Sequence, residues 1–340
     1  MGFDSQNTYS KIWVRMPNWL GDFIMALPHL KAMKEHHPNA QLTLIAKPQF
    51  KDLIDLFHVA DQFLPLPVGA AARFRQLYSK GRKEKPDCQV LFTNSFRGDL
   101  EALLIGATRR WGMAYPKKRR PFLTDVHRLD TIKAELNRTH QTTLWEEFLV
   151  SFDLIKAISD RPLDVKGVAK KTNKIGIIPG SSNNPKKCWS ISNWCRFIQE
   201  LVQEKPEYEI NIYGTPSDDV ITKRISEATG LNVRDWTGKT NLKQLALELA
   251  SCLLVIGNDA GGMHLANAVG ASVVVLFGPT NPLVTFPFFD APKTCMQPED
   301  CPPEGGCSIQ SLNPSDVATR LLDFIQSDSG AVDERLCGLN

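Results

Sequence analysis

The sequence predicts an α/β protein made of two domains, each a doubly wound parallel sheet of the Rossmann type. In both halves of the chain, short apolar runs alternate with longer segments of helical periodicity, which is typical of parallel strands covered by helices on both faces. Residues 160–173 are poor in large apolar side chains and are typical of a linker. The 340 residues are enough for two domains of ordinary size.

The first half predicts three strands, each followed by a helix. The apolar runs "KIWVRM", "QLTLIA" and "CQVLFTN" are the expected strands, and we expect helices at residues 23–36, 48–57 and 100–107. Because parallel strands point the same way, the turns after them gather at one edge of the sheet, where ligands of such folds bind.

The second half repeats this pattern. The expected strands are "KIGIIPG", "YEINIYG", "NVRDWTG", "LLVIGND" and "SVVVLFGP". The expected helices are at residues 192–204, 218–230, 241–252 and 314–325. We place the domains at residues 1–165 and 172–313, followed by a terminal helix over 314–327 and a flexible tail over 328–340.

The composition is that of a globular protein, with 42% hydrophobic and 23% charged residues. No apolar run is long enough to span a membrane, and the polar start "MGFDSQNTYS" is unlike a signal peptide. We therefore expect a cytoplasmic protein whose eight cysteines are mostly reduced.

Charge is spread unevenly along the chain. Residues 1–172 hold 27 Lys and Arg against 18 Asp and Glu, a net +9, whereas residues 173–340 hold 13 against 19, a net −6. The excess of positive charge predicts that the first half of the chain binds an acidic partner. The alternative is a basic surface that contacts only solvent.

The stretch "GNDAGGMHLANAVG", residues 257–270, is a turn between a strand and a helix of small residues. Amide groups at a helix N-terminus lack partners and attract anions. Gly261 and Gly262 let a phosphate approach the backbone, His264 can donate to that phosphate, and Asp259 can bond the loop or a sugar hydroxyl. We predict an anionic ligand here; a tight turn with a buried structural histidine is the alternative.

Two further strand–turn–helix segments carry charged residues. In "IIPGSSNNPKKCWSISNW", residues 177–194, Ser181, Ser182 and the lysines indicate a second anionic contact, and a lysine there could neutralise a phosphate leaving group. A helix cap with solvated lysines is the alternative. In "VRMPNWLGDFIMALP", residues 14–28, Asp22 lies at a helix N-terminus, which favours its charged form. It is a candidate general base, with helix capping as the alternative.

The first half also holds "TNSFRGD", residues 93–99, and "RRWGMAYPKKRRP", residues 109–121, which joins six basic residues to a tryptophan and a tyrosine. Basic segments with aromatics also suit nucleic acid, but no binding module of that kind is recognisable, so we expect no nucleic-acid partner and keep it only as an alternative. "TGKT" at residues 237–240 lacks the first glycine of a phosphate-binding loop.

Nothing in the sequence predicts a metal ion. Cys295, Cys301 and Cys307 are spaced more widely than paired zinc ligands, and no fourth ligand lies at a zinc-like interval, so loop cysteines without a metal are expected. The sequence has no Asp-x-Asp motif, which argues against a metal-bridged diphosphate.

Taken together, these motifs resemble the lipopolysaccharide heptosyltransferases. The resemblance rests on "LGD" after the first strand, "KCWS" after "PGSSNNP", "TGKT" before "NL", and "NDAGGMH" with "LFGPTNP", in the family's order over nearly the whole chain. "TNSFRGDL" and the late cysteine loop are most similar to the heptosyltransferase II branch.

The resemblance implies a GT-B fold, two Rossmann-like domains facing a cleft, with the terminal helix crossing back to the first domain. It implies inverting, metal-independent transfer of L-glycero-D-manno-heptose from ADP-heptose to the inner core of lipopolysaccharide, an acceptor of the heptosyl-Kdo2-lipid A type, without a cofactor. The first domain would bind this acceptor at the membrane surface, and the second domain would bind the nucleotide sugar. The enzyme would be cytoplasmic and peripheral to the inner face of the inner membrane.

The resemblance also implies roles for individual residues. Asp22 matches the general base, Lys187 the lysine at the donor phosphates, and Thr240 the contact to adenine. The other donor contacts would be Ser181, Ser182, Asp218 (near the ribose), Asp259, Ala260, Gly261, Gly262 and His264. The acceptor contacts would be Asn94, Ser95, Arg97, Lys118, Arg119 and Arg120.

Two positions depart from the family pattern. Ala260 stands where Ser or Thr is usual, so phosphate binding would depend more on amides and His264, and Ser190 stands where proline often begins the helix. Alternatives stay open: a heptosyltransferase of type I or III, another glycosyltransferase of the family, or a non-catalytic nucleotide-sugar-binding protein, which would not need Asp22.

Overall fold

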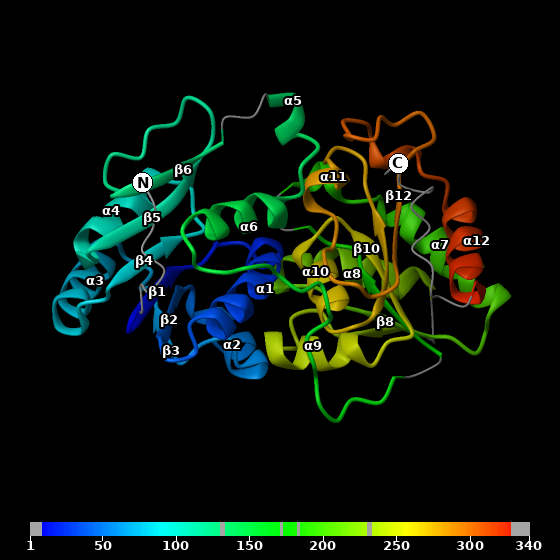
Figure 1. Ribbon diagram of the computed structural model, residues 1–340. Helices are drawn as coiled ribbons and strands as arrows, with labels where there is room; N and C mark the ends of the chain where they lie inside the picture. Colours follow the sequence, from blue (N-terminus) through cyan, green and yellow to red (C-terminus); the bar gives the residue numbers. More distant parts are fainter. Residues whose placement is uncertain (1–8, 130–132, 171–172, 182–183, 230–232, 328–340) are drawn as a thin grey trace. The chain divides into compact units, whose positions relative to one another are not determined.

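The computed structural model describes residues 9–129, 133–170, 173–181, 184–229 and 233–327 of the chain (Figure 1). The chain divides into two compact units, residues 1–159 and 160–340. In its described part, each unit holds one parallel sheet of six strands flanked by helices, which confirms the predicted α/β class with two doubly wound sheets. None of the helices in these ranges is both long enough and apolar enough to cross a bilayer.

The sheet of the first unit contains β1 (Lys11–Arg15), β2 (Gln41–Ala46), β3 (Gln62–Pro65), β4 (Cys88–Leu91), β5 (Arg109–Ala114) and β6 (Asp125–Arg128). Its helices are α1 (Leu20–His36), η1 (Pro48–Phe50), α2 (Lys51–Phe57), α3 (Ala70–Glu84), α4 (Phe96–Ile105), α5 (Lys133–Leu136) and α6 (Gln141–Ser151). The strand order is β3-β2-β1-β4-β5-β6, with every neighbouring pair parallel. α1 packs with α6, and α3 packs with α4 on the other face of the sheet (Figure 1).

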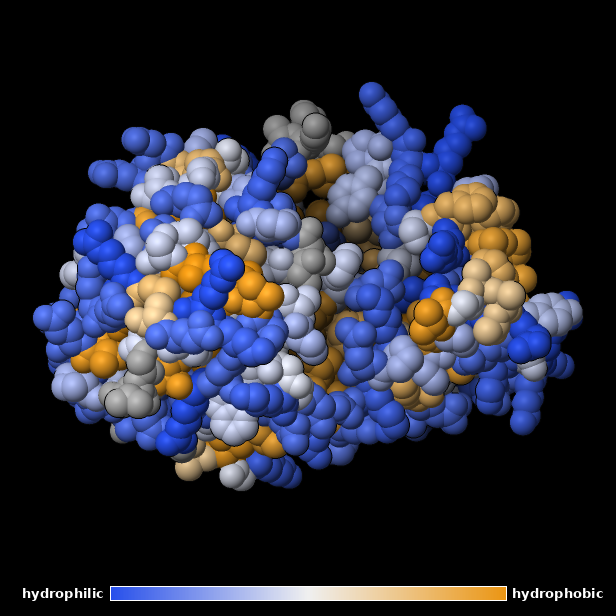
Figure 2. Space-filling view, turned by 180° about the vertical axis from the view of Figure 1, so that it is seen from behind, coloured by the Kyte–Doolittle hydropathy of each residue, from blue (hydrophilic) through white to orange (hydrophobic). Residues whose placement is uncertain are grey.

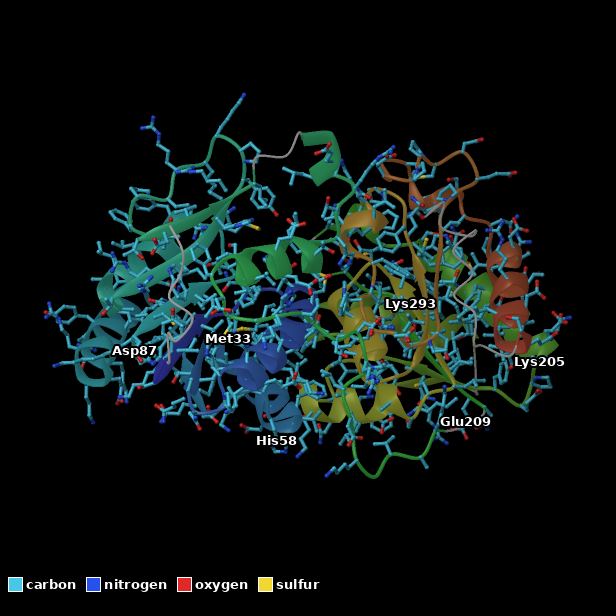
Figure 3. All side chains as sticks on the ribbon, viewed as in Figure 1. Met33, His58, Asp87, Lys205, Glu209 and Lys293 are labelled. Carbon is cyan, nitrogen blue, oxygen red and sulfur yellow. A yellow bond between two sulfur atoms is a disulfide. The ribbon has the colours of Figure 1, made fainter. Side chains whose placement is uncertain are left out.

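The central strands of this sheet are buried because helices cover both faces, which is why they are nearly continuous apolar runs. Asp87, labelled in Figure 3, joins two of them: its Oδ2 accepts from the amides of Ser10 and Lys11 at 2.7 and 2.9 Å. This carboxylate fixes the start of β1 beside the start of β4.

The sequence did not indicate the strands β3, β5 and β6 or the helices α3 and α6. β3 and β6 are short edge strands, half exposed, and so lack an apolar run. The basic segment 109–121 begins as the strand β5, in which Trp111 is buried. Of the basic residues in this segment, only Lys117, Lys118 and Arg119, in the loop after β5, are exposed as the composition suggested.

The sheet of the second unit contains β7 (Lys174–Ile178), β8 (Glu209–Ile212), β9 (Val233–Asp235), β10 (Leu254–Asn258), β11 (Ser272–Leu276) and β12 (Lys293–Met296). Its helices are η2 (Pro185–Lys187), α7 (Ile191–Glu204), η3 (Pro216–Asp218), α8 (Asp219–Thr229), α9 (Leu242–Ala250), α10 (Gly261–Ala268), α11 (Pro282–Thr285), η4 (Ile309–Ser311) and α12 (Pro314–Gln326). The order is β12-β11-β10-β7-β8-β9, again with parallel neighbours.

The helix α12 packs against α7 within this second unit (Figure 1). Leu321 is wholly buried in the apolar cluster that includes Phe197 of α7, and Ser315 Oγ donates to Glu200 Oε1 at 3.0 Å. α12 thus belongs to the core of the second unit, and the crossing of the terminal helix back to the first domain stays a prediction. The predicted tail, residues 328–340, lies outside the described residues.

The late cysteine loop holds a disulfide between Cys301 and Cys307, which departs from the expectation that the cysteines are mostly reduced. The amides of Gly306 and Cys307 both donate to Gly278 O, at 2.8 and 3.1 Å, so the loop is fixed to the turn after β11. Within the described ranges, no group of three or more His, Cys, Asp or Glu side chains is arranged to hold a metal ion. The free thiols are Cys88, Cys188, Cys195 and Cys252.

Candidate active site

In each sheet the strand order reverses at one point, between β1 and β4 in the first unit and between β10 and β7 in the second. The chain leaves these two strands toward opposite faces of the sheet, so a crevice opens at their carboxyl ends. Ligands of doubly wound sheets bind at such reversal points. Most of the predicted site residues follow one of these four strands.

A pocket with a volume of about 250 Å³ lies at the reversal point of the first sheet. Asp22 contributes to its wall from the first turn of α1, where the helix N-terminus favours the ionised carboxylate. Asn94 and Ser95 enter from the turn between β4 and α4. The structure thus brings the predicted base and two of the predicted acceptor contacts to one pocket. The lining is Pro17, Asn18, Trp19, Asp22, Phe92, Thr93, Asn94, Ser95, Met113, Tyr115, Gln141 and Trp145.

Three lining side chains, Tyr115, Gln141 and Trp145, are site residues that the sequence did not indicate. Gln141 and Trp145 come from α6, whose sequence has no motif and which lies far along the chain from Asp22. The Tyr115 hydroxyl donates to Gln141 Oε1 at 3.1 Å. Burial raises the pKa of Tyr115, and the negative charge of Asp22 raises it further, so this phenol stays neutral beside the carboxylate.

Behind this pocket, Glu101 of α4 binds two arginines. Arg15 Nε lies 2.9 Å from Glu101 Oε2, and Arg73 Nη1 lies 3.2 Å from Oε1. Arg15 Nη2 also donates to Asn18 Oδ1 at 3.1 Å. The buried pair of Arg15 and Glu101 therefore fixes the side chain of Asn18 in the pocket wall.

Arg120, predicted to contact the acceptor, is instead buried behind the same pocket. Its side chain is 1% exposed, and its Nε lies 2.9 and 2.8 Å from the two carboxylate oxygens of Asp99. Its Nη2 donates to Thr93 O at 3.0 Å, and its Nη1 donates to Met113 O. Because these donors are used inside the protein, we correct the prediction: Arg120 positions Thr93 and Met113 in the pocket wall.

The other predicted acceptor contacts, Arg97, Lys118 and Arg119, are exposed and do not line the pocket. Lys118 reaches its rim, since its Nζ donates to the backbone carbonyl of Asn94. Arg97 lies in the first turn of α4, and Arg119 is exposed in the same loop as Lys118. Of these three cations, Lys118 is the one whose printed contact places it at the pocket rim.

In the second unit, Lys187 and Asp259 form an ion pair at the reversal point of the sheet. Lys187 Nζ lies 2.6 Å from Asp259 Oδ2, and their side chains are 22% and 7% exposed. Thr280 Oγ1 donates to the same Oδ2 at 2.8 Å. Lys187 ends the turn after β7, and Asp259 directly follows β10. Thr280 lies in the motif "LFGPTNP" that carries the family resemblance, but the sequence predicted no role for it, because its turn follows a third strand, β11, and carries no charge.

Asn258, the last residue of β10, fixes the segment that carries Lys187. Its Nδ2 donates to Pro179 O at 2.6 Å, and its Oδ1 accepts from Trp189 N at 3.2 Å. Asn258 is wholly buried, so both bonds form out of contact with water. The two ends of the turn are thereby tied to the strand that ends beside Asp259.

The helix α10 begins at Gly261, with Ala260 as its N-cap and no side-chain cap. The amides of its first turn therefore carry the partial positive charge of a helix N-terminus. His264 is buried within this helix. A Cβ on Gly262 would lie 2.7 Å from Ile178 Cδ1, so a larger residue there would displace the Ile178 side chain at the end of β7.

Ser181, Asp218 and Thr240 follow the strands β7, β8 and β9, so these predicted donor contacts lie at the carboxyl edge of the sheet. Asp218 is 8% exposed, and its Oδ2 accepts from Thr215 N and Oγ1 at 2.8 and 2.7 Å, which is a helix-capping arrangement. Thr240 is half-buried in the turn before α9, and Ser181 is half-buried after β7. Ser182 lies outside the described residues.

Two doubly wound sheets with charged side chains at their reversal points form an architecture that two-domain glycosyltransferases share. The sequence profile of glycosyltransferase family 9 (heptosyltransferase) matches residues 87–310. The chain belongs to this family, which confirms the family resemblance of its motifs. The protein is accordingly a glycosyltransferase.

Most of the chain is similar to characterised relatives. It is 25% identical over 310 residues to the lipopolysaccharide heptosyltransferase 2 of Escherichia coli strain K12, covering 82% of this chain and 85% of that one. It is 27% identical over 330 residues to the lipooligosaccharide heptosyltransferase 2 of Campylobacter jejuni serotype O:6, covering 90% and 96%. The solved structure of E. coli ADP-heptose LPS heptosyltransferase II matches with a TM-score of 0.76 and 23% identity, over 94% of this chain and 99% of that one. This match confirms the expected GT-B fold.

Proposed function

We propose that this protein transfers L-glycero-D-manno-heptose from ADP-heptose to the inner core of lipopolysaccharide, with inversion and without a metal ion. One observation carries the proposal: each sheet holds, at its reversal point, a charged group suited to one half of this reaction. Asp22 lies in the pocket of the first unit, and Lys187 pairs with Asp259 in the second. Family membership and the similarity to proteins named lipopolysaccharide heptosyltransferase 2 support the substrate class.

In this proposal the second unit binds the donor. The amides of the first turn of α10 bind phosphate oxygens of ADP-heptose. Asp259, held by Thr280, keeps the ammonium of Lys187 beside this helix end. When the bond from the sugar C1 to the phosphate oxygen breaks, negative charge grows on the departing ADP, and Lys187 stabilises it. Ser181 and Thr240 remain proposed donor contacts.

The first unit binds the acceptor. An acceptor hydroxyl attacks C1 of the heptose, and Asp22 takes its proton as the new bond forms. A single displacement on the face opposite the leaving ADP inverts the anomeric centre. Asn94 and Ser95 offer hydrogen bonds to sugar hydroxyls, and Trp145 offers an apolar wall for a sugar ring.

The test is a transfer assay with the purified protein, ADP-heptose and heptosyl-Kdo2-lipid A. We expect release of ADP and a lipid product heavier by one heptose, with the inverted anomer by NMR. Kdo2-lipid A without the first heptose tests the type I acceptor in parallel. Binding of ADP-heptose without transfer to either acceptor would indicate a non-catalytic nucleotide-sugar-binding protein instead.

Removal of divalent metal ions should leave transfer unchanged. Lys187 and the helix-end amides supply the positive charge at the diphosphate that many transferases obtain from a bound cation. The rate is measured with EDTA, and again with EDTA and an excess of Mg²⁺ or Mn²⁺. Loss of activity in EDTA that either ion restores would contradict this account of the donor site.

A further inference from the structure

The helix α4 has its acidic side chains buried and several apolar ones exposed. Asp99 and Glu101 are 1% and 0% exposed, whereas Phe96 and Leu103 are 64% and 42% exposed. Phe96 and Leu103 lie two turns apart on one face of the helix, with the half-buried Leu100 between them. Helices on a protein surface usually have the opposite polarity, with charges facing water.

The buried acids explain the charge that remains on this surface. Asp99 pairs with Arg120, and Glu101 pairs with Arg15 and Arg73, so the negative charges of α4 are neutralised inside the fold. The outer surface of the helix keeps Arg97. Burial of the acids therefore leaves α4 both apolar and positive on the side that faces solvent.

The loop after β5 extends this surface. Phe122 packs edge-on against Phe96, with 5.3 Å between ring centroids. Lys117, Lys118 and Arg119 of the same loop are exposed. In Figure 2, apolar surface is visible on the first unit, at the right of the view, beside hydrophilic side chains that project from it. We name the surface of Phe96, Arg97, Leu100, Leu103, Phe122 and residues 117–119 the α4 face.

The helix α3, which packs beside α4, adds further positive charge. Arg75, Lys80 and Arg82 are exposed on it, and its last residue, the acidic Glu84, pairs with Lys11. The surroundings of the α4 face are therefore cationic, in agreement with the excess of basic residues in the first half of the sequence.

We propose that the α4 face docks on an anionic lipid bilayer. Phe and Leu side chains flanked by Lys and Arg are the composition of segments that lie in the membrane interface, where anionic lipids attract each cation. A second copy of the chain fits less well, because two α4 faces would bring like charges together. The occupant is therefore identified by charge complementarity and by the exposed aromatic ring.

The position of the α4 face connects docking with the proposed function, on which this step rests. Ser95 lines the pocket and is the N-cap of α4, so Phe96 lies directly outside the pocket that holds Asp22. A bilayer bound to the α4 face would place its headgroup layer at this pocket. A lipid-linked acceptor sugar could then enter while its acyl chains stay in the membrane.

Vesicle sedimentation tests the proposal with the full-length protein and no donor or acceptor. We expect binding to vesicles of phosphatidylcholine mixed with phosphatidylglycerol, and little binding to phosphatidylcholine alone. Phe96→Ser with Leu103→Ser should weaken binding about tenfold. Val220→Ser, a change at a 63% exposed residue of the second unit, is the matched control and should bind like the unchanged protein.

A second variant tests the contribution of charge: Lys117, Lys118 and Arg119 are all replaced with Gln. Each cation near an anionic membrane accounts for about a fivefold change in binding, so the triple variant should lose well over tenfold. Its control replaces three exposed lysines of the second unit, Lys166, Lys170 and Lys243, and should lose much less. Raised salt should weaken vesicle binding of the unchanged protein more than that of the triple variant, which keeps Arg97 and the cations of α3.

Equal losses in the α4-face variants and in their controls would overturn the proposal. So would a dimer in sedimentation velocity that dissociates on Phe96→Ser with Leu103→Ser, because the occupant would then be a second copy. Transfer to a delipidated acceptor separates the two hypotheses: the Phe96→Ser, Leu103→Ser variant should keep full rate there. A protein that binds vesicles but transfers no heptose would contradict the proposed function and leave the docking surface standing.

Discussion

The reversal points of the two sheets are alike in topology and opposite in chemistry. In the first unit, the buried pair of Arg120 and Asp99 lies behind the pocket, and the pocket wall itself carries the carboxylate of Asp22. In the second unit, the ion pair of Lys187 and Asp259 lies at the reversal point, beside the N-terminus of α10, which has no side-chain cap. The same strand order thus sets where a ligand can bind, and the side chains set the charge of the place: a carboxylate in the first unit, an ammonium paired with a carboxylate in the second.

The largest expected effect comes from removing the proton acceptor. Asp22→Asn keeps the size of the side chain but should lower turnover about 10²–10⁴-fold, as the loss of a general base usually does. Binding of ADP, which we assign to the second unit, should not change. Turnover is measured with saturating donor and acceptor, and ADP binding is measured by calorimetry.

Asn18→Ala is the control for Asp22→Asn, because Asn18 lines the same pocket without an ionisable group. It should change the acceptor KM more than kcat. Near-normal turnover of the Asp22→Asn protein would remove Asp22 from the mechanism and leave its favourable interaction with the helix N-terminus as its role.

The sequence could predict those parts of the molecule that depend on neighbours along the chain. Each strand–turn–helix segment around a reversal point is local, and so the positions of Asp22, Lys187 and Asp259 could be predicted. The contribution of Gln141 to the pocket could not be predicted from the sequence, because it depends on the packing of α6 against α1 across the fold. Arg120 was misassigned because composition cannot show whether a basic residue in a basic segment has a buried carboxylate to meet.

The second prediction breaks the ion pair behind the pocket. Arg120→Ala leaves Asp99 buried without its partner, which should lower the free energy of unfolding of the first unit by about 3–5 kcal/mol. Hydrogen exchange of peptides from α4 and β5, with peptides from α9 and α10 as an internal reference, measures the loss. The double variant Asp99→Leu, Arg120→Met should recover part of it, because no unpaired charge remains.

The control for this pair is Arg119→Ala, one residue earlier and exposed. It should leave exchange in both units unchanged, since surface charges contribute little to stability. A loss on Arg119→Ala equal to that on Arg120→Ala would mean that the loop, and not the buried pair, supports the pocket.

The third prediction concerns the ion pair at the reversal point of the second sheet. Lys187→Ala should reduce ADP affinity roughly 10–150-fold, from the 1.5–3 kcal/mol typical of a hydrogen bond to a charged group. Lys186→Ala is the control, since that exposed neighbour makes no ion pair in the described structure and should bind ADP normally. Calorimetric titration with ADP decides between them, and a larger loss for Lys186→Ala would move the phosphate contact to Lys186.

The last prediction uses pH to distinguish the stabilities of the two units. Six of the seven histidines belong to the first unit, and one of them, His29, lies wholly buried beneath the pocket, with its ring edge-on to Phe92 and Trp145. Burial lowers the pKa of His29 to about 4, although its Nε2 bonds Thr142 O at 3.0 Å. The folded state therefore stays unprotonated at pH values where the unfolded chain, with a pKa near 6.5, takes up a proton.

Since the unfolded chain binds more protons between about pH 6.5 and pH 4, acidification through this window should destabilise the first unit by at most about 1.4 kcal/mol per pH unit. Above pH 6.5 the contribution of His29 to stability is complete, and it falls as the pH drops toward 4. Hydrogen exchange of α1 and α6 peptides, compared with α9 and α10 peptides, should show this slope in the first unit. In His29→Gln, which cannot titrate, the slope should become shallower; an unchanged slope would assign the acid sensitivity to other groups.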